Sequence, residues 1–268
     1  MNNKKSNVIK SDRNTLTTIE NKVCFIKLNR PEIRNPISEV MWELLETFKK
    51  IQYDDQIKAV IITGAERVFC AGGNLNNVQG DINVFDTRKR LKQIHDLLHI
   101  MRSLEKPIIA AVNGAAAGAG VSLALACDLV ISARSAFFIQ SFVKVGALPD
   151  FGGIHFLTQL IGPHRAKELM LLGNRITAEQ ALQLGMINEV ADDDDLIDRA
   201  YSVAQKIVDG PSLTIGLIKQ LVNRSINITL EDFLEIETFG QALCFQTKDF
   251  KEGVSAFLEK RSPYFKGE

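Results

Sequence analysis

The chain has no excess of charge of either sign, because 32 Lys and Arg residues balance 32 Asp and Glu residues over 268 positions. It also lacks an apolar run approaching the ~18 residues that a membrane-spanning helix needs. Nothing therefore indicates a polyanionic or anionic-lipid partner, and we expect neither nucleic acid nor membrane among its partners. The first fifteen residues contain no apolar segment, so residues 1–16 are predicted to be a flexible N-terminus rather than a signal peptide.

Cysteine is scarce and scattered. Cys24, Cys70, Cys127 and Cys244 are far apart in the sequence and form no CxxC pair. Isolated cysteines of this kind are typical of reduced, buried thiols. They indicate a cytoplasmic protein, since disulfides are rare in that compartment.

Metal-ligand spacings are missing as well. His95 and His99 are four residues apart on a predicted helix, but no third ligand accompanies them. The acidic run 192–195 is typical of a solvated helix start, because helix N-termini favour acidic residues. We expect no metal site.

What the chain does contain is one stretch rich in small residues, from Pro107 to Gly153. It predicts a strand at 107–112, a Gly/Ala turn at 113–120, a small-residue helix at 121–128 and a second strand at 129–133. The helix begins with free backbone N–H groups, which suit a developing negative charge. A Gly-bounded loop then carries one carboxylate, Asp150.

The segments around this stretch predict an α/β fold. Strands at 23–28 and 59–64 flank a helix at 39–53 that Ser38 caps, which implies a parallel, right-handed crossover. A second Gly-containing loop follows at 69–75. The remaining predicted elements are a helix at 87–104, a helix to 161 broken at Gly162-Pro163, helices at 165–172 and 178–184, a short strand at 185–190, and helices at 196–209, 212–225, 230–246 and 248–259.

The two Gly loops have more than one interpretation. The GxxxGxG spacing over 114–120 is not that of a dinucleotide-binding loop, and no Lys-Ser/Thr follows as in a P-loop. The glycines either make tight turns only, or place two backbone donors on one oxygen. Neighbouring parallel strands would bring such loops together at their carboxyl ends. From these residues alone both interpretations stay open.

Four segments resemble the signature segments of the crotonase superfamily, which includes the enoyl-CoA hydratases and isomerases. They are Phe69–Leu75, Ala111–Gly120, Gly146–Gly153 and Phe250–Pro263, and the likeness covers about residues 17–267. The resemblance implies an α/β spiral of ββα units over 17–205, followed by a C-terminal helical trimerisation region at 206–268. It further implies a homotrimer or a hexamer of two trimers, and an acyl-CoA thioester as substrate. Coenzyme A is then part of the substrate, and no separate cofactor is implied.

The resemblance also assigns roles to residues. It places an oxyanion hole at the N–H groups of Gly73 and Ala119, which would stabilise a thioester enolate. Ser122 and Phe142 occupy the positions of the two glutamates with which hydratases of the superfamily activate water. Asp150 occupies the position of the single acid in the 2-(1,2-epoxyphenyl)acetyl-CoA isomerases and related enoyl-CoA isomerases. One carboxylate suffices to move a proton from one carbon to another.

Further residues are candidates for binding the substrate. Arg34 and Lys260 are expected to meet coenzyme A phosphates, although a solvated surface position for Arg34 is an alternative. Phe142 and Leu148 are expected to shape the acyl pocket, with core packing as the alternative. The full set of predicted binding residues is Arg34, Ala71, Asn74, Leu75, Phe142, Leu148, Phe257 and Lys260. Of these, Phe257 and Lys260 would reach across a trimer interface.

The sequence thus favours an acyl-CoA isomerase that shifts a double bond, or an epoxide-derived ring, through an enolate with Asp150 as proton shuttle. Two enzymatic alternatives are a hydratase-like and a dehalogenase-like relative. The superfamily's dehalogenases have a Trp where this chain has Phe142, and a nearby His base. A third alternative is a non-catalytic acyl-CoA-binding scaffold. The acyl chain and the pathway stay open.

Overall fold

The computed structural model describes residues 14–78 and 83–268. Residues 1–13 of the predicted flexible N-terminus lie outside this part. The first strand, β1 (Thr15–Glu20), begins two residues before the predicted start of the core at residue 17.

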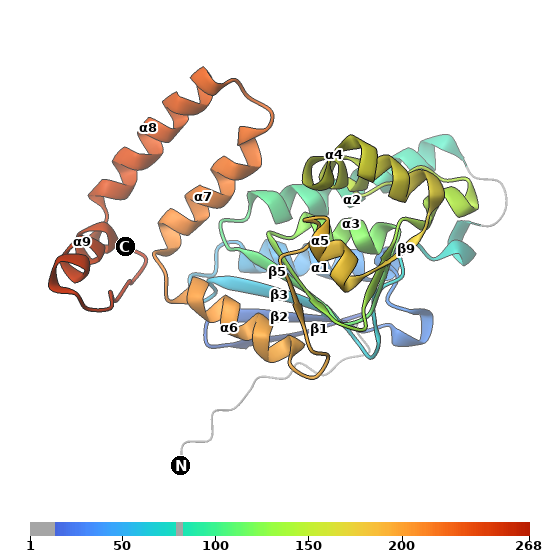
Figure 1. Cartoon of the computed structure of the whole chain (residues 1–268), viewed down its shortest axis with the longest axis horizontal. Helices are drawn as coiled ribbons and strands as arrows, with labels where there is room; N and C mark the ends of the chain where they lie inside the picture. Colours follow the sequence, from blue (N-terminus) through green and yellow to red (C-terminus); the bar gives the residue numbers. More distant parts are fainter. Residues whose placement is uncertain (1–13, 79–82) are drawn as a thin grey trace, which may run out of the picture.

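Two β-sheets form the centre of the molecule (Figure 1). The larger has six strands in the order β1-β2-β3-β5-β7-β10, in which only the β1–β2 pair is antiparallel. The smaller has four strands in the order β4-β6-β8-β9, with β8 and β9 antiparallel. The strands after β1 are β2 (Val23–Leu28), β3 (Ala59–Gly64), β4 (Val68–Cys70), β5 (Ile108–Val112), β6 (Ala115–Ala117), β7 (Leu129–Ala133), β8 (Phe137–Ile139), β9 (Arg175–Thr177) and β10 (Glu189–Ala191).

The chain winds through the two sheets as a spiral. The pairs β3 and β4, β5 and β6, and β7 and β8 each place their first strand in the large sheet and their second in the small one. A helix follows each pair: α2 (Val84–Ser103), α3 (Ala119–Ala126) and α4 (Gly153–Leu172). These repeated ββα units confirm the predicted fold class.

The small sheet, like strand β1 of the large one, was not predicted from the sequence. Its strands have only three residues each, too few for an alternating pattern to be recognised. The predicted Gly/Ala turn at 113–120 therefore contains β6, and helix α3 begins at Ala119 instead of residue 121. All eight residues of α3 are buried, as its Ala-rich composition indicates.

One helix covers a face of the large sheet, and the others described next pack against one another. Helix α6 (Leu196–Val208) lies across β2, β3, β5 and β7 on one face of the large sheet, while α1 (Ile37–Ile51) packs against α2, and α3 against α4 (Figure 1). Helix α1 begins after Pro36, so Ser38 lies within its first turn instead of capping it.

Helix α4 has the predicted break, because Gly162 has a φ of 74° just before Pro163. The short helices are α5 (Ala178–Gln183), η1 (Pro31–Ile33), η2 (Leu75–Val78) and η3 (Ser141–Val145).

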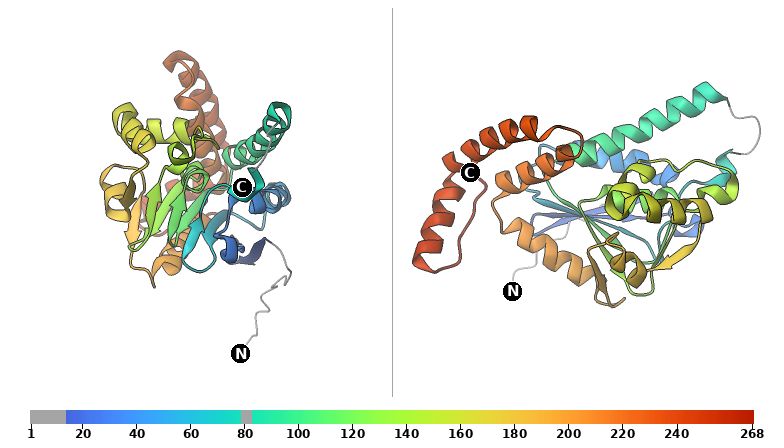
Figure 2. Two further views of the ribbon diagram at one scale, coloured as in Figure 1. Left: turned by 90° about the vertical axis from the view of Figure 1, so that its right-hand side faces the viewer. Right: turned by 45° about the horizontal axis from the view of Figure 1, so that its top comes forward.

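The last three helices extend from one end of the molecule. They are α7 (Ser212–Ser225), α8 (Leu230–Gln246) and α9 (Lys248–Glu259), as predicted. In Figure 1 and in the right view of Figure 2 they form an arm that leaves the body of the protein. Helix α8 packs against α7 and α9, and Cys244 is its one buried residue.

Two further predictions concern the chain as a whole. All four cysteines are buried and unpaired, which confirms the interpretation of their spacing. No helix in the described residues is long and apolar enough to cross a lipid bilayer.

Candidate active site

The two Gly loops meet at Gly72. Its φ is +91°, a conformation that favours glycine. A Cβ at this position would lie 2.8 Å from the carbonyl oxygen of Ala117 and 3.3 Å from the backbone nitrogen of Ala119. The backbones of the loop after β4 and the loop after β6 are therefore in direct contact. Close approach, and not only turn formation, accounts for glycine here.

Two backbone N–H groups become available where these loops meet. Ala119 is the first residue of α3, so its N–H has no acceptor within the helix. Gly73 is exposed, and nothing lies within 4 Å of the position of a Cβ. The positive end of the α3 dipole adds to the field at this point. The arrangement is suited to receiving an oxygen that gains negative charge.

The loop that carries Gly73 is fixed by the segment before α1. Ala71 donates from its N–H to the carbonyl of Arg34 at 3.0 Å, and Ile37 donates to the carbonyl of Gly72 at 2.8 Å. The N–H of Asn74 donates to Oγ of Ser38 at 3.3 Å. These bonds hold both sides of Gly73, so its N–H direction is set by the fold.

A buried side chain supports the same segment, and the sequence analysis did not identify it. Asn35 is fully buried with a φ of 51°, and its Nδ2 donates to the carbonyl of Val68 at 2.8 Å. The N–H of Arg30 donates to Oδ1 of Asn35, also at 2.8 Å. Asn tolerates the left-handed conformation better than most residues, which is the one local signal in the sequence.

Asp150 lies in the loop between η3 and α4 and is half-buried. Burial raises the pKa of its carboxyl above the usual value, while its own backbone N–H and the charges of Arg90 and His95 act in the opposite direction. Its Oδ1 is buried and has no hydrogen-bond partner in the described part of the chain. A carboxylate with these properties can both accept and return a proton near neutral pH more readily than a solvated one.

The backbone after Asp150 is strained. Phe151 is buried with a φ of 51°, and Gly152 follows with a φ of 73°. A bulky residue in the left-handed region is an outlier that persists only when its surroundings enforce it. The N–H of Gly153 then donates to the carbonyl of Asp150 at 2.9 Å, which closes the turn onto α4. The strain thus fixes the position of the carboxylate relative to the helix.

The predicted binding residues divide into two groups. Phe142 lies against the site, because a Cβ on Gly118 would be 3.5 Å from its ring. Ala71 and Asn74 flank Gly73 in the same loop. Leu75 and Leu148 are 55% and 76% exposed, so neither packs into the core.

Of the other three predicted binding residues, Arg34 contacts the Gly73 loop through its backbone, and two lie farther away. Arg34 is exposed, and its carbonyl, rather than its guanidinium, is the group that contacts the Gly73 loop. Phe257 and Lys260 lie at the end of α9, on the far side of the arm from α3 and α4 (Figure 1). Within one chain they are not brought to the site.

Arg90 and His95 complete the surroundings of Asp150, and neither was predicted to be near it. Both lie on α2, and His95 borders a hollow of about 540 Å³ along one face of that helix. The other residues that line it are Val84, Thr87, Arg88, Leu91 and Lys92. The hollow is lined by residues of α2 alone, and Asp150 is not among them.

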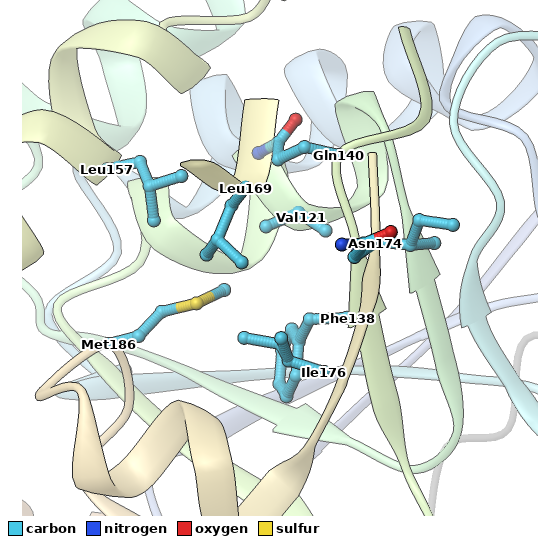
Figure 3. Close-up of a pocket in the computed structure, with 9 residues that line it drawn as sticks. Val121, Phe138, Gln140, Leu157, Leu169, Asn174, Ile176 and Met186 are labelled. Carbon is cyan, nitrogen blue, oxygen red and sulfur yellow. The ribbon is translucent and has the colours of Figure 1, made fainter. Parts of the chain in front are cut away.

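A second cavity is lined by Val121 of α3 and by Leu157 and Leu169 of α4. It measures only about 10 Å³ and is mostly apolar, with Gln140 at one end and Phe138 and Ile176 at the other (Figure 3). It is too small for an acyl chain. In the described residues, no group of three or more His, Cys, Asp and Glu side chains is arranged to hold a metal ion.

Gly73 and Ala119 thus offer backbone N–H groups from two loops in contact, and Asp150 offers a half-buried carboxylate on the segment that leads into α4. The enoyl-CoA hydratase/isomerase family model matches residues 18–268, and the chain belongs to this family.

Individual relatives agree with this membership. The chain is 43% identical to the 1,2-epoxyphenylacetyl-CoA isomerase of Escherichia coli (strain K12), over 94% of this chain and 98% of the relative. It is 36% identical to the short-chain-enoyl-CoA hydratase of Clostridium acetobutylicum, over 92% and 95%. The crystal structure of an enoyl-CoA hydratase from Bacillus anthracis superposes with a TM-score of 0.90 at 34% identity, over 96% of this chain and 100% of that one.

Proposed function

We propose that this protein is an acyl-CoA isomerase that moves a double bond, or rearranges an epoxide-derived ring, through a thioester enolate. The observation that carries the proposal is the half-buried carboxylate of Asp150, whose loop leads into α4 at Gly153, beside Ser122 of the helix that Ala119 begins. A second half-buried carboxylate, Glu39, accepts from Nδ2 of Asn74 at 3.3 Å next to Gly73. Ser122 and Phe142, at the positions of the two hydratase glutamates, cannot act as carboxylate bases. The relative in Escherichia coli named as a 1,2-epoxyphenylacetyl-CoA isomerase supports the same assignment.

The proposed reaction begins when the thioester carbonyl accepts hydrogen bonds from the N–H groups of Gly73 and Ala119. Asp150 removes a proton from the carbon chain, and the charge moves to the carbonyl oxygen. Each donor in comparable sites stabilises such an oxyanion by roughly 3 kcal/mol. Asp150 then returns the proton to a different carbon. The raised pKa of Asp150 makes its carboxylate a stronger base, which favours the first transfer, the removal of the proton from carbon.

A hydratase is the second candidate, because relatives such as that of Clostridium acetobutylicum bear that name. Hydration requires a water positioned and activated across the double bond. With Ser122 and Phe142 in the glutamate positions, Asp150 would be the one carboxylate for this task. We therefore expect hydration of crotonyl-CoA to be negligible beside isomerisation.

The remaining predicted residues enter the proposal through assembly. The arm exposes large apolar side chains on α8 and α9, including Phe239, Leu243 and Phe257, which are 68%, 60% and 83% exposed. We propose that a homotrimer, alone or paired as a hexamer, covers them. Phe257 and Lys260 would then reach the acyl-CoA site of a neighbouring subunit, and Arg34 and Leu75 would contact coenzyme A.

The test is a panel of 3-enoyl-, 2-enoyl- and ring-epoxide CoA thioesters with the purified protein. Products are identified by mass and by absorbance of the conjugated enoyl thioester. Isomerised 3-enoyl or rearranged epoxide product is the expected result. Efficient hydration of crotonyl-CoA would contradict the isomerase assignment, and binding without any turnover would favour the acyl-CoA-binding scaffold.

A further inference from the structure

A groove of about 470 Å³ lies at the carboxyl end of α3, the opposite end of that helix from Ala119. Leu125 and Ala126 of α3 border it, together with residues from the end of α2 and from α4 and α7. Among the described residues that line it, none belongs to the loops of Gly73, Ala119 or Asp150. The groove has the volume of a small-molecule pocket and is separate from the proposed acyl-CoA site.

Two helices contribute exposed apolar side chains to this groove. Ile218, Val222 and Ile226 are spaced by four residues along α7 and its end, so they lie on one face of the helix. They are 57%, 60% and 56% exposed, and Leu160 of α4 is 47% exposed. Covering these side chains with an apolar chain would remove them from water and so favour binding.

Three ionised side chains also border the groove, and two of them neutralise each other. Nζ of Lys219 lies 2.8 Å from Oδ2 of Asp128, and it donates to the carbonyls of Met101 at 2.9 Å and Lys106 at 3.1 Å. An ammonium group has three N–H donors, and these three partners use all of them. Lys219 is therefore not available to a ligand.

The third ionised side chain, Arg102 of α2, is half-buried and keeps an uncompensated charge. Its guanidinium donates to the carbonyl of Asn223 at 2.9 Å and lies over the ring of Phe156, with Cζ 5.4 Å from the ring centroid. It makes no ion pair within residues 14–78 and 83–268. Burial lowers the pKa of Arg102, while the charge of Asp128 raises it. Since Asn223 takes one of five N–H donors, the guanidinium can still bind an anion.

The groove thus combines one net positive charge with an apolar surface. A phosphate dianion would leave a negative charge uncompensated against apolar side chains, and a neutral lipid would leave the guanidinium of Arg102 covered without a partner. A carboxylate has one charge and two oxygens that match the planar fork of a guanidinium. A carboxylate with an apolar chain therefore fits both features.

We propose that this groove is a second binding site, which takes an amphiphilic carboxylate with its head on Arg102 and its chain along Leu160, Ile218 and Val222. The free acids that form when acyl thioesters are hydrolysed belong to this chemical class. The proposal does not rest on the proposed isomerase activity, because the groove lies outside the acyl-CoA site.

The test is calorimetric binding of octanoate and of 1-octanol, which has the same chain length without the charge. We expect the wild type to bind octanoate at least about 10-fold more tightly, the scale of a hydrogen bond to a charged group. Arg102→Gln should remove this preference, and Arg102→Lys should keep part of it. Arg165→Gln on α4 is the control that should keep it, since Arg165 pairs with Glu168 at the surface. Equal wild-type affinity for the two compounds would overturn the proposal.

A second variant tests the apolar part of the groove and leaves Arg102 in place. Leu160→Asp puts a like charge beside the chain, so octanoate binding should weaken by about 10-fold or more. Leu172→Asp, at a 58% exposed position at the end of the same helix, should not weaken it. Equal weakening by both variants would contradict the placement of the chain.

Two further results would overturn the site. Saturating butanoyl-CoA should leave the affinity for octanoate unchanged, and mutually exclusive binding would place octanoate in the acyl-CoA site instead. Absence of octanoate binding, with dissociation of an oligomer by Leu160→Asp in sedimentation, would show that a second copy of the chain fills the groove. Neither measurement requires turnover, so an inactive protein would leave the result for the groove intact.

Discussion

Asp150 is the residue on which the proposed chemistry depends. Replacing it by Asn keeps the shape and removes the base, so turnover should fall by about 10²-fold or more. Acyl-CoA binding should survive, because the Gly73 and Ala119 loops are untouched. Solvent-deuterium exchange at the α-carbon, followed by NMR, measures the base directly. Asp194→Asn, at an exposed position near α6, is the control. Undiminished exchange in Asp150→Asn would assign the proton transfer to another group.

The groups around Asp150 predict the acid limb of the pH profile of kcat/KM, which is the pH range in which kcat/KM falls as the solution is acidified. The base must be ionised, and burial raises its pKa, so kcat/KM should fall at a higher pH than for an ordinary carboxyl as the solution is acidified. The charge of Arg90 lowers that pKa. Arg90→Gln should therefore move the acid limb to still higher pH, while Arg90→Lys should leave it nearly in place. A limb that moves equally in both variants would show that the charge is not responsible.

Gly153 and Ser122 should be coupled in stability. An alanine Cβ at 153 would meet Oγ of Ser122 at 2.4 Å but its Cβ at an acceptable 3.5 Å. Gly153→Ala should cost about 1–3 kcal/mol, as overpacking does, and Ser122→Ala should remove most of that cost. Urea unfolding of the two single variants and the double variant measures the coupling. Gly240→Ala, with its nearest neighbour at 3.7 Å, should show none. Additive effects of the two substitutions would contradict the contact.

At the scale of elements, Lys219 joins α7 to the large sheet. It is 7% exposed, and its Nζ lies 2.8 Å from Oδ2 of Asp128. It also donates to the carbonyls of Met101 at 2.9 Å and Lys106 at 3.1 Å, at the end of α2 and just after it. The same oxygen, Oδ2 of Asp128, also accepts the N–H of Ile108 at 2.7 Å. One buried cation thus connects α7, the end of α2 and the start of β5.

Lys219→Met should therefore destabilise the protein by about 3–5 kcal/mol, because it leaves the Asp128 carboxylate buried without its cation. Adding Asp128→Asn should recover part of the loss. Burial already raises the pKa of Asp128 above its unfolded value, and removing Lys219 raises it further. A carboxyl of this kind destabilises the fold once it ionises, so the deficit should shrink as the pH is lowered. Chemical denaturation at several pH values measures it, and a deficit that is independent of pH would contradict this explanation.

At the same scale, the long helices and the strands β2, β3, β5 and β7 were predictable because each has a marked apolar pattern, whereas β1 was not predicted as a strand. The strands β4, β6, β8 and β9 were not, because three residues cannot show a period. They form by pairing with each other and with nothing local. Because β6 directly precedes α3, the start of that helix was also misplaced, and with it the first free N–H at Ala119.

For the whole molecule, the extended arm predicts self-association. Phe239 and Leu243 on α8 are exposed, whereas α1, α2, α4 and α6 each bury several apolar side chains. Phe239→Asp or Leu243→Asp should dissociate the proposed trimer, because each would place an unpaired charge in a buried contact. Sedimentation at micromolar concentration gives the mass. Ile19→Asp on β1, 53% exposed, is the control that should keep the wild-type mass. A monomeric wild-type protein would contradict the proposal.

The sequence by itself determined the α/β class, the family resemblance and the identity of the proposed acid, because these follow from local apolar periods and from short motifs such as the segment around Asp150. Only the tertiary structure decided how Gly72 approaches Ala119, how Arg90 and His95 face Asp150, and how Ser122 and Gln140 meet at Gly153. These contacts join residues from different ββα units. Their distances depend on how the two sheets stack and how α2, α3 and α4 pack, and no local pattern of residues encodes that.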